Sequence, residues 1–224
     1  AYLLCLAGLL GVTITGDAFN IFVFLEISSL SSYVLISLGR QPMALTAAYR
    51  YLVLGTIGAT FYLIGVGLLY QATGTLNIAD LATRVAELTE SRSVRAAFAF
   101  MTVGIGIKLA LFPLHIWLPN AYAYAPSVSS AFLAATATKV SIYVLIRVFY
   151  TIFGPAFSFE TLPLDWVLLL LAIIAMFVGS TIAIFQVDIK RMLAYSSVAQ
   201  IGYMIVGVSL VSVLGMTGGL LHLF

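Results

Sequence analysis

The stretch VGIGIKLALFPLHIWLPNAYAYAPS, residues 103–127, is the most informative part of this chain for its fold. It is apolar along most of its length, yet it carries Lys108, Pro113 and His115 close together. Pro113 has no N–H group, so the carbonyl of Leu109 loses its helical donor, and the proline ring bends the helix there. A freed carbonyl is tolerated in a membrane where it is buried in protein or faces water. The stretch therefore predicts a membrane helix that is interrupted next to a lysine.

The composition around this stretch is that of an integral membrane protein. Of 224 residues, 62% are hydrophobic and 8% are charged, and the mean hydropathy is +1.14. A soluble domain is about a quarter charged, and long uncharged runs indicate membrane helices and not barrel strands. The net charge of +2 is too small to indicate a nucleic-acid partner. The single Cys5 excludes a disulfide framework, a cysteine-rich zinc site and a cysteine-ligated iron–sulfur cluster.

The apolar runs predict an all-α polytopic bundle with six complete and two partial spans. The complete spans are expected at 18–38, 46–72, 96–118, 127–152, 164–187 and 193–213, and the partial ones at 1–15 and from Met216 onward. The chain begins at Ala1 and ends at Phe224 inside apolar runs, so we expect an internal piece of a larger protein.

Residues 73–95 contain three acidic and three basic residues, too many for a membrane interior. We expect an extramembrane loop with a short amphipathic helix that begins at Asn77 or Asp80 and turns Leu81, Val85 and Leu88 to one face. A surface helix between two spans is the simpler interpretation, and a helix that contacts lipid or a partner is the alternative.

Three ionisable residues fall near the centres of predicted spans: Glu26, Lys108 and Lys139. A charge at mid-membrane costs about 2.5–3.5 kcal/mol on insertion scales, so such residues are candidates for an ion path. Glu26 shares a helix face with Ser29 and Tyr33, and Lys139 shares one with Tyr143. These polar stripes are expected to face the protein interior or a hydrated cavity.

Each of these residues also has a structural interpretation. Glu26 is, on that view, a protonated acid bonded to its neighbours, Lys139 pairs with a distant carboxylate, and Lys108 is a satisfied lysine on a kinked helix. His115 lies seven residues after Lys108, close to the same azimuth if the helix continues. His115, Tyr143 and His222 are further candidates for the path. Lysine and histidine are side chains that can take up and release protons.

Motifs for other chemistry are absent from the sequence. GIGIK at 104–108 lacks the third glycine of a dinucleotide fingerprint, and there is no HExxH, CxxC or nucleophile elbow. We therefore expect no catalytic residues, no metal site, no cofactor and no redox centre in this chain.

These residues resemble the antiporter-like membrane subunits of the complex I and Mrp family, and most of all the D subunit of Mrp sodium/proton antiporters. The resemblance rests on five segments that follow the family's order and cover most of the chain: DAFNIFVFLEI (17–27), KLALFPLHIWLP (108–119), AYAPS (123–127), TKVSIYVLIR (138–147) and DIKRMLAYSSVAQ (188–200).

The resemblance implies a fourteen-helix fold with two inverted five-helix units, of which 1–152 is the first and 164–224 begins the second. It implies that Glu26, Lys108 and Lys139 form the proton path, with the second half-path beyond Phe224. It also implies that the loops near 40, 120 and 190 are cytoplasmic. The positive charges alone leave orientation undecided, at four against four.

Three functions follow as hypotheses. The first is proton and monovalent-cation translocation as a subunit of a multisubunit antiporter in a bacterial plasma membrane, with other membrane subunits and sodium or potassium as partners. The second is a proton-pumping subunit of NADH:quinone oxidoreductase or a related membrane-bound hydrogenase. The third is an inert scaffold in such an assembly. The ionisable residues are the same in the first two.

Overall fold

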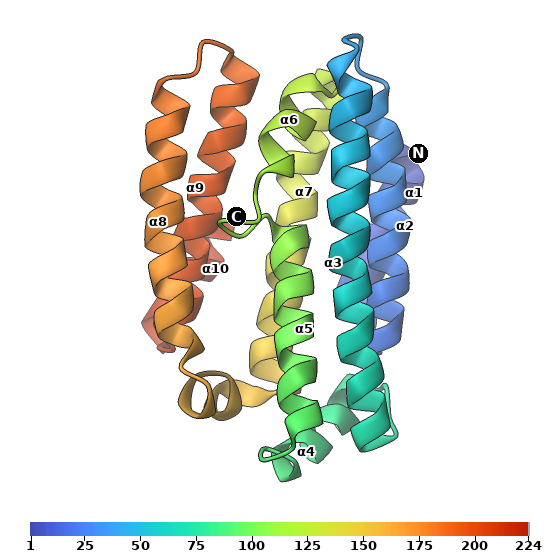
Figure 1. Cartoon of the computed structure of the whole chain (residues 1–224), viewed down its shortest axis with the longest axis vertical. Helices are drawn as coiled ribbons and strands as arrows, with labels where there is room; N and C mark the ends of the chain where they lie inside the picture. Colours follow the sequence, from blue (N-terminus) through green and yellow to red (C-terminus); the bar gives the residue numbers. More distant parts are fainter. Residues whose placement is uncertain (224) are drawn as a thin grey trace. The chain divides into compact units, whose positions relative to one another are not determined.

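A computed structural model describes residues 1–223, apart from the side chain of Thr161; Phe224, the end of the predicted second unit, lies outside it. The named elements of the described residues are all helices (Figure 1). Its elements are α1 (Tyr2–Ile14), α2 (Ala18–Ser37), α3 (Met43–Thr73), α4 (Ile78–Glu87), α5 (Arg92–Leu109), α6 (Trp117–Tyr124), α7 (Ser127–Ile146), the π-helices η1 (Arg147–Ile152) and η2 (Ala156–Thr161), α8 (Leu164–Ile184), α9 (Ile189–Ser209) and α10 (Val213–Leu223).

Five of the described helices are long and apolar enough to cross a membrane. They are α2, α3, α7 together with η1, α8 and α9. The sequence predicts six complete spans, and the difference lies at 96–118. That span is not one helix, because α5 ends at Leu109 and α6 begins only at Trp117.

The start of α9 differs from the sequence prediction. The charged run at 188–191 predicts a solvated loop, with the span beginning at 193. Instead, the carboxylate of Asp188 accepts a hydrogen bond from the backbone N–H of Arg191 at 3.0 Å. This N-cap satisfies a free donor of the first turn and starts the helix at Ile189.

The chain divides into two compact units. The first is Ala1–Ser32, Leu52–Lys108 and Val140–Leu162, and the second is Tyr33–Tyr51, Leu109–Lys139 and Pro163–Phe224. In the second unit α9 packs against α8, α10 and α6, and Figure 1 shows α8 beside α9. In the first, α4 packs against η1. The five-helix units expected from the resemblance are a different division and stay a prediction.

Within the first unit, α3 and α5 approach closely at two glycines. A Cβ atom on Gly104 would lie 2.5 Å from the carbonyl oxygen of Gly58 and 2.6 Å from the backbone nitrogen of Tyr62. Backbone atoms cannot move aside as a flexible side chain can, so the two helices need glycine here.

We expect Gly104→Ala to destabilise the protein by about 1–3 kcal/mol, the usual range for overpacking. Gly67→Ala is the matched control, because a Cβ on Gly67 of α3 meets nothing within 4 Å. The free energy of unfolding in detergent micelles measures both variants. Equal stability of the two would contradict the close approach of α3 and α5.

Helix α4 lies within the predicted extramembrane stretch and turns its apolar face to the protein. Asn77 is its N-cap, and its side-chain oxygen accepts from the N–H groups of Ala79 and Asp80. Leu81 and Val85 are fully buried, and the helix packs against η1. The apolar face is therefore covered by the chain itself, which favours the surface-helix interpretation over lipid contact.

Asp80 should make the stability of α4 depend on acid pH. The hydrogen bond from Arg84, at 3.1 Å, holds the pKa of the Asp80 carboxyl below its usual value. The unfolded chain then binds a proton more readily, so this stability is present above the ordinary pKa of about 4 and is lost as pH falls through the folded value. Thermal unfolding at pH 3–7 should show a smaller acid loss for Asp80→Asn than for the unchanged protein. Glu87→Gln, at an exposed acid of the same helix, should retain the full acid loss.

A candidate intramembrane ion-pair site

The interruption predicted from Pro113 is confirmed. Helix α5 ends at Leu109, whose carbonyl is expected to lose its donor, and residues 110–116 form turns before α6 begins. Ala110 takes a left-handed conformation with a φ of 60°, which ends an α-helix sharply. Figure 1 shows this non-helical connection between the two helical segments. The break places Lys108 in the last turn of α5.

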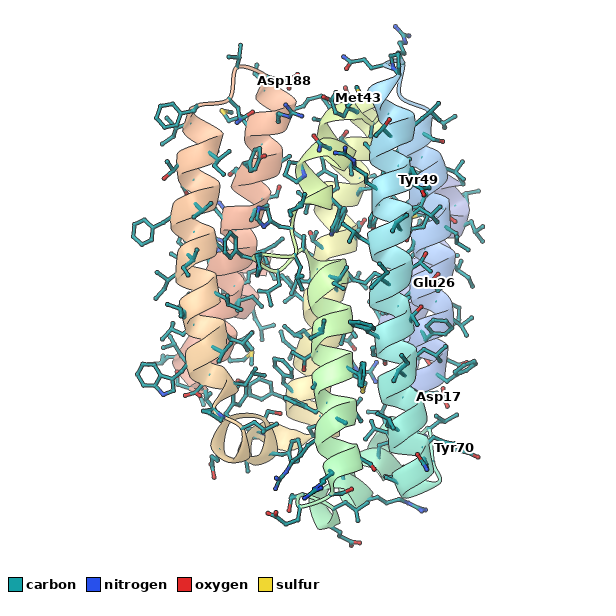
Figure 2. All side chains as sticks on the ribbon, viewed as in Figure 1. Asp17, Glu26, Met43, Tyr49, Tyr70 and Asp188 are labelled. Atoms are coloured by element: carbon teal, nitrogen blue, oxygen red, sulfur yellow. The ribbon has the colours of Figure 1, made fainter. Side chains whose placement is uncertain are left out.

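The structure brings Lys108 and Glu26 together within the first unit. The Nζ atom of Lys108 lies 3.0 Å from Oε1 of Glu26, and it also donates to Oγ of Ser29 at 2.6 Å. Lys108 is 5% exposed and the Glu26 side chain is 21% exposed. Figure 2 shows Glu26 midway along α2. One cation of α5 is thus bound by a carboxylate and a hydroxyl of α2.

Three features make this buried cation tolerable. The carboxylate compensates its charge, the serine accepts one of its three N–H donors, and the carbonyl end of the α5 dipole favours positive charge. A buried ion pair of this kind stabilises little compared with an apolar pair, but it is costly to leave half-made. The pair is therefore weak evidence for a role in stability.

Ser29 differs from the other hydroxyls along the same helix. The hydroxyls of Ser28, Ser31 and Ser32 donate to carbonyls of α2 itself, at 2.7–2.9 Å. Such bonds satisfy the serine hydroxyl within its own helix, so it needs no hydrogen-bond partner on another helix. Helical spacing places Ser29 on the Glu26 face, but its direct contact with Lys108 was not predicted from the sequence.

Lys139, in the second unit, has a different environment. Its Nζ atom donates to the carbonyl of Ala134 at 2.8 Å, and among the described residues no carboxylate lies within ion-pair distance of it. The structural alternative of a distant carboxylate partner therefore has no support in the described part of the chain. Lys139 is half-buried on α7.

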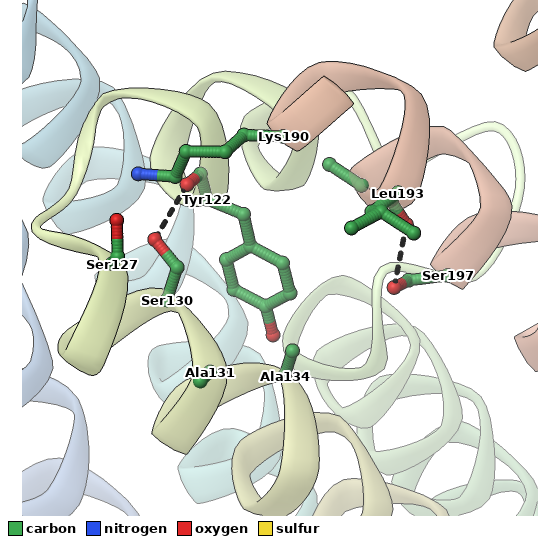
Figure 3. A pocket seen from close by; sticks show the side chains of 9 residues that line it. Tyr122, Ser127, Ser130, Ala131, Ala134, Lys190, Leu193 and Ser197 are labelled. Atoms are coloured by element: carbon green, nitrogen blue, oxygen red, sulfur yellow. Dashed lines mark hydrogen bonds between the residues drawn. The ribbon is translucent and has the colours of Figure 1, made fainter. Parts of the chain in front are cut away.

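A pocket of about 260 Å³ opens between α6, α7 and α9 in the second unit (Figure 3). Its lining includes Ala134, the residue whose carbonyl binds Lys139, and Tyr122. Ser130 of α7 lies on one side of it and donates to the carbonyl of Tyr122 at 2.7 Å, and the side chain of Lys190 extends toward that side from α9. The pocket thus places a few polar groups in a mostly apolar hollow.

Tyr143 and Arg147 both contact the end of α1. The Tyr143 hydroxyl donates to the carbonyl of Thr13 at 3.1 Å, and Arg147 donates to that of Thr15 at 2.7 Å. The Arg147 guanidinium also lies 5.6 Å from the centre of the Tyr143 ring. Free carbonyls at a helix C-terminus favour a cation. Arg147 therefore satisfies a carbonyl at the C-terminal end of α1.

The two histidines have separate environments. The condition under which His115 would share the azimuth of Lys108 is not met, because the helix does not continue through 110–116. His115 is half-buried and stacks on Phe112, with ring centres 5.1 Å apart. His222 of α10 hydrogen-bonds Gln200 of α9 and lies edge-on to Tyr203. Gln200 and Tyr203 belong to the polar face that helical spacing predicts for that span.

The fold and the ion pair define a polytopic helical membrane protein with an interrupted helix and a charged pair inside it. The chain belongs to the family described as NADH:quinone oxidoreductase/Mrp antiporter, TM, whose model matches residues 15–224. It is an integral membrane protein of that family.

Three relatives show how the family is represented. The chain is 51% identical over 221 residues to NADH-quinone oxidoreductase subunit N of Desulforudis audaxviator, and 37% identical over 224 residues to the D subunit of the Na(+)/H(+) antiporter of Alkalihalophilus pseudofirmus. Each alignment covers 99% of this chain and 44% of the relative. The solved structure of the Mrp complex from Dietzia sp. DQ12-45-1b matches with a TM-score of 0.88 at 33% identity, over 99% of this chain and 41% of that one. The chain therefore spans less than half the length of these relatives.

Proposed function

We propose that this chain translocates protons across a bacterial plasma membrane as one subunit of a multisubunit cation/proton antiporter. The observation that carries the proposal is the buried contact between Lys108 and Glu26 beside the interrupted helix, at 3.0 Å. Membrane transporters commonly build ion sites at discontinuous helices. Membership of the family, and the relatives named as an antiporter subunit and an oxidoreductase subunit, support it.

In the proposed mechanism the ion pair is a switch for proton release. While Glu26 lies against Lys108, the carboxylate stabilises the ammonium form. When the two separate, the buried ammonium loses its counter-charge and gives its proton up. Ser29 holds the amine in place through both states. Lys139 is the proposed next carrier, and the pocket beside Ala134 is the proposed route for water toward it.

The fold proposed for the whole protein is the fourteen-helix arrangement with two inverted five-helix units. The regions near 40, 120 and 190 lie at one end of the second unit, since Arg40, Tyr124 and Lys190 line one hollow there. We propose that this end faces the cytoplasm, with other membrane subunits, sodium or potassium, and lipid as the remaining partners.

A second candidate is a proton-pumping subunit of NADH:quinone oxidoreductase or a related membrane-bound hydrogenase. The 51% identity to oxidoreductase subunit N favours it. The same residues would then carry protons, but electron transfer in partner subunits would drive them. Purification of the native complex distinguishes the two, since quinone- or iron–sulfur-binding subunits support the second candidate and antiporter subunits alone support the first.

The decisive experiment for proton translocation is ion flux through the assembled complex in inverted membrane vesicles. A pH-sensitive dye reports proton movement when a sodium or potassium gradient is applied. Removal of the titratable amine in Lys108→Met is the variant that tests the mechanism. Undiminished flux in that variant would leave the inert-scaffold hypothesis standing.

A further inference from the structure

Two cations at the start of α9 reach across to α6, the second half of the interrupted helix. Lys190 Nζ donates to the carbonyl of Ala125 at 2.5 Å, and Arg191 Nη2 donates to Oδ1 of Asn120 at 2.6 Å and to the hydroxyl of Tyr124 at 3.3 Å. The Arg191 guanidinium also lies 5.6 Å from the centre of the Tyr124 ring. These five residues form what we call the α6–α9 clamp.

The position of the two cations is unfavourable for their own helix. The N-terminal turn of a helix carries partial positive charge, so Lys190 and Arg191 oppose the dipole of α9. The C-terminal end of α6 carries partial negative charge, and Lys190 meets the carbonyl of its C-cap residue, Ala125, there. The two side chains therefore satisfy the neighbouring helix and not the helix that bears them.

Beside the pocket, polar side chains add to the packing of α9 against α6. The pocket of about 260 Å³ separates the walls that α6 and α7 form from the wall of α9. In Figure 3 Tyr122 and Ser130 lie on one side, Leu193 and Ser197 on the other, and Lys190 extends across the rim. Lys190 of α9 is thus the polar side chain that reaches across the rim to the end of α6.

Helix α6 needs such outside support. It has eight residues and no side-chain N-cap, and helices this short are marginal in isolation. Its first residue, Trp117, stacks on Tyr51 of α3 with ring centres 3.9 Å apart and planes 5° apart. Its last turn is held by the clamp. The half helix is thus fixed by an aromatic contact at one end and by charges at the other.

We propose that the α6–α9 clamp makes α6 and the first turn of α9 move as one body during transport, with Arg191 and Asn120 as positioning residues. The inference rests on the proposed function, because it concerns how the interrupted helix works in proton transfer. The chain runs from Lys108 to α6 through the non-helical residues 110–116. Helix α6 lies in the predicted first five-helix unit and α9 in the second, so the clamp joins one predicted unit to the other.

The test uses the assembled complex in inverted vesicles with four single variants: Arg191→Gln, Arg191→Lys, Asn120→Ala and Arg50→Gln. Proton flux is measured against pH, and hydrogen–deuterium exchange is measured over 110–124. Loss of a charge-assisted bond should speed exchange there roughly ten- to a hundredfold in Arg191→Gln, with an altered pH profile of flux. Arg191→Lys retains the charge without the guanidinium fork and should give an intermediate result.

The control and the coupled variant sharpen the result. Arg50 is an exposed cation of the same unit, and Arg50→Gln should leave exchange and the pH profile unchanged. The double variant Asn120→Ala with Arg191→Gln should exchange no faster than Arg191→Gln alone, because both substitutions remove the same hydrogen bond between Arg191 and Asn120. If Arg191→Gln prevents assembly, Asn120→Ala and Arg191→Lys still test the clamp through both readouts.

Two results would overturn the clamp. One is unchanged exchange over 110–124 in the Arg191 and Asn120 variants. The other is faster exchange with an unchanged flux profile, which makes Arg191 merely structural. Normal flux in Lys108→Met refutes the proposed function itself. If Lys108→Met loses flux while Arg191→Gln shows normal exchange and a normal pH profile of flux, only the clamp is refuted.

Discussion

Lys108→Met should reduce proton flux through the assembled complex by a factor of about 100 or more, which is effectively its loss. Methionine has a length close to that of lysine but no titratable amine, so the variant removes proton exchange while it retains most of the packing. The lower bound is the usual contribution of a positioned acid–base group. Dye-reported flux in inverted vesicles measures it, normalised to the amount of complex in the membrane.

The matched control is Arg92→Met, which removes a cation from the exposed first turn of the same helix. It should transport at close to the normal rate. Equal rates for Lys108→Met and Arg92→Met would refute the proton role of Lys108. Low flux in both, with reduced complex in the membrane, would indicate that α5 had lost its fold instead.

Glu26→Gln should destabilise the protein by about 3–5 kcal/mol, the usual cost of removing one partner from a buried ion pair. The amide is nearly isosteric with the carboxylate, so the loss is one of charge compensation at Lys108 and not of volume. Proton flux should fall as well, because the switch has lost its counter-charge. The free energy of unfolding in mixed micelles measures the first effect and vesicle flux the second.

A double variant separates the ion pair from simple packing. Glu26→Gln combined with Lys108→Met leaves no unpaired charge, so it should be more stable than Glu26→Gln alone. Glu160→Gln, at an exposed acid, should change stability by no more than about 0.5 kcal/mol. Strictly additive losses at Glu26 and Lys108 would contradict the 3.0 Å contact.

Much of the fold was predictable because its causes are local. Long apolar runs indicate membrane helices, and Asp17 stands next to the start of α2, where its carboxylate accepts from the N–H of Asn20 at 2.8 Å. The interruption after Leu109 follows from a missing N–H at Pro113. Each of these depends on groups within a few residues of one another, so the order of residues is enough to predict them.

One prediction was wrong, and one spacing argument does not apply, because helix geometry differs from what the local pattern suggests. The charged run at 188–191 predicts a loop, but Asp188 caps α9 and its two cations are bound to α6. The His115 spacing assumes a continuous helix, and the interruption predicted from the same stretch removes that premise. Charge alone did not predict where α9 begins, and residue spacing alone does not predict which side chains share a helix face when the helix is interrupted.

The order of residues is enough to establish the membrane class, the interrupted helix and the ionisable candidates Glu26, Lys108 and Lys139. The packing of the helices was needed to show that Lys108 meets Glu26, 82 positions away, and that Ser29 is the serine it binds. Helical spacing fixes which side chains share a face, but it does not fix which face meets which helix. That choice depends on how the helices pack, down to the close approach of α3 and α5 at Gly58 and Gly104.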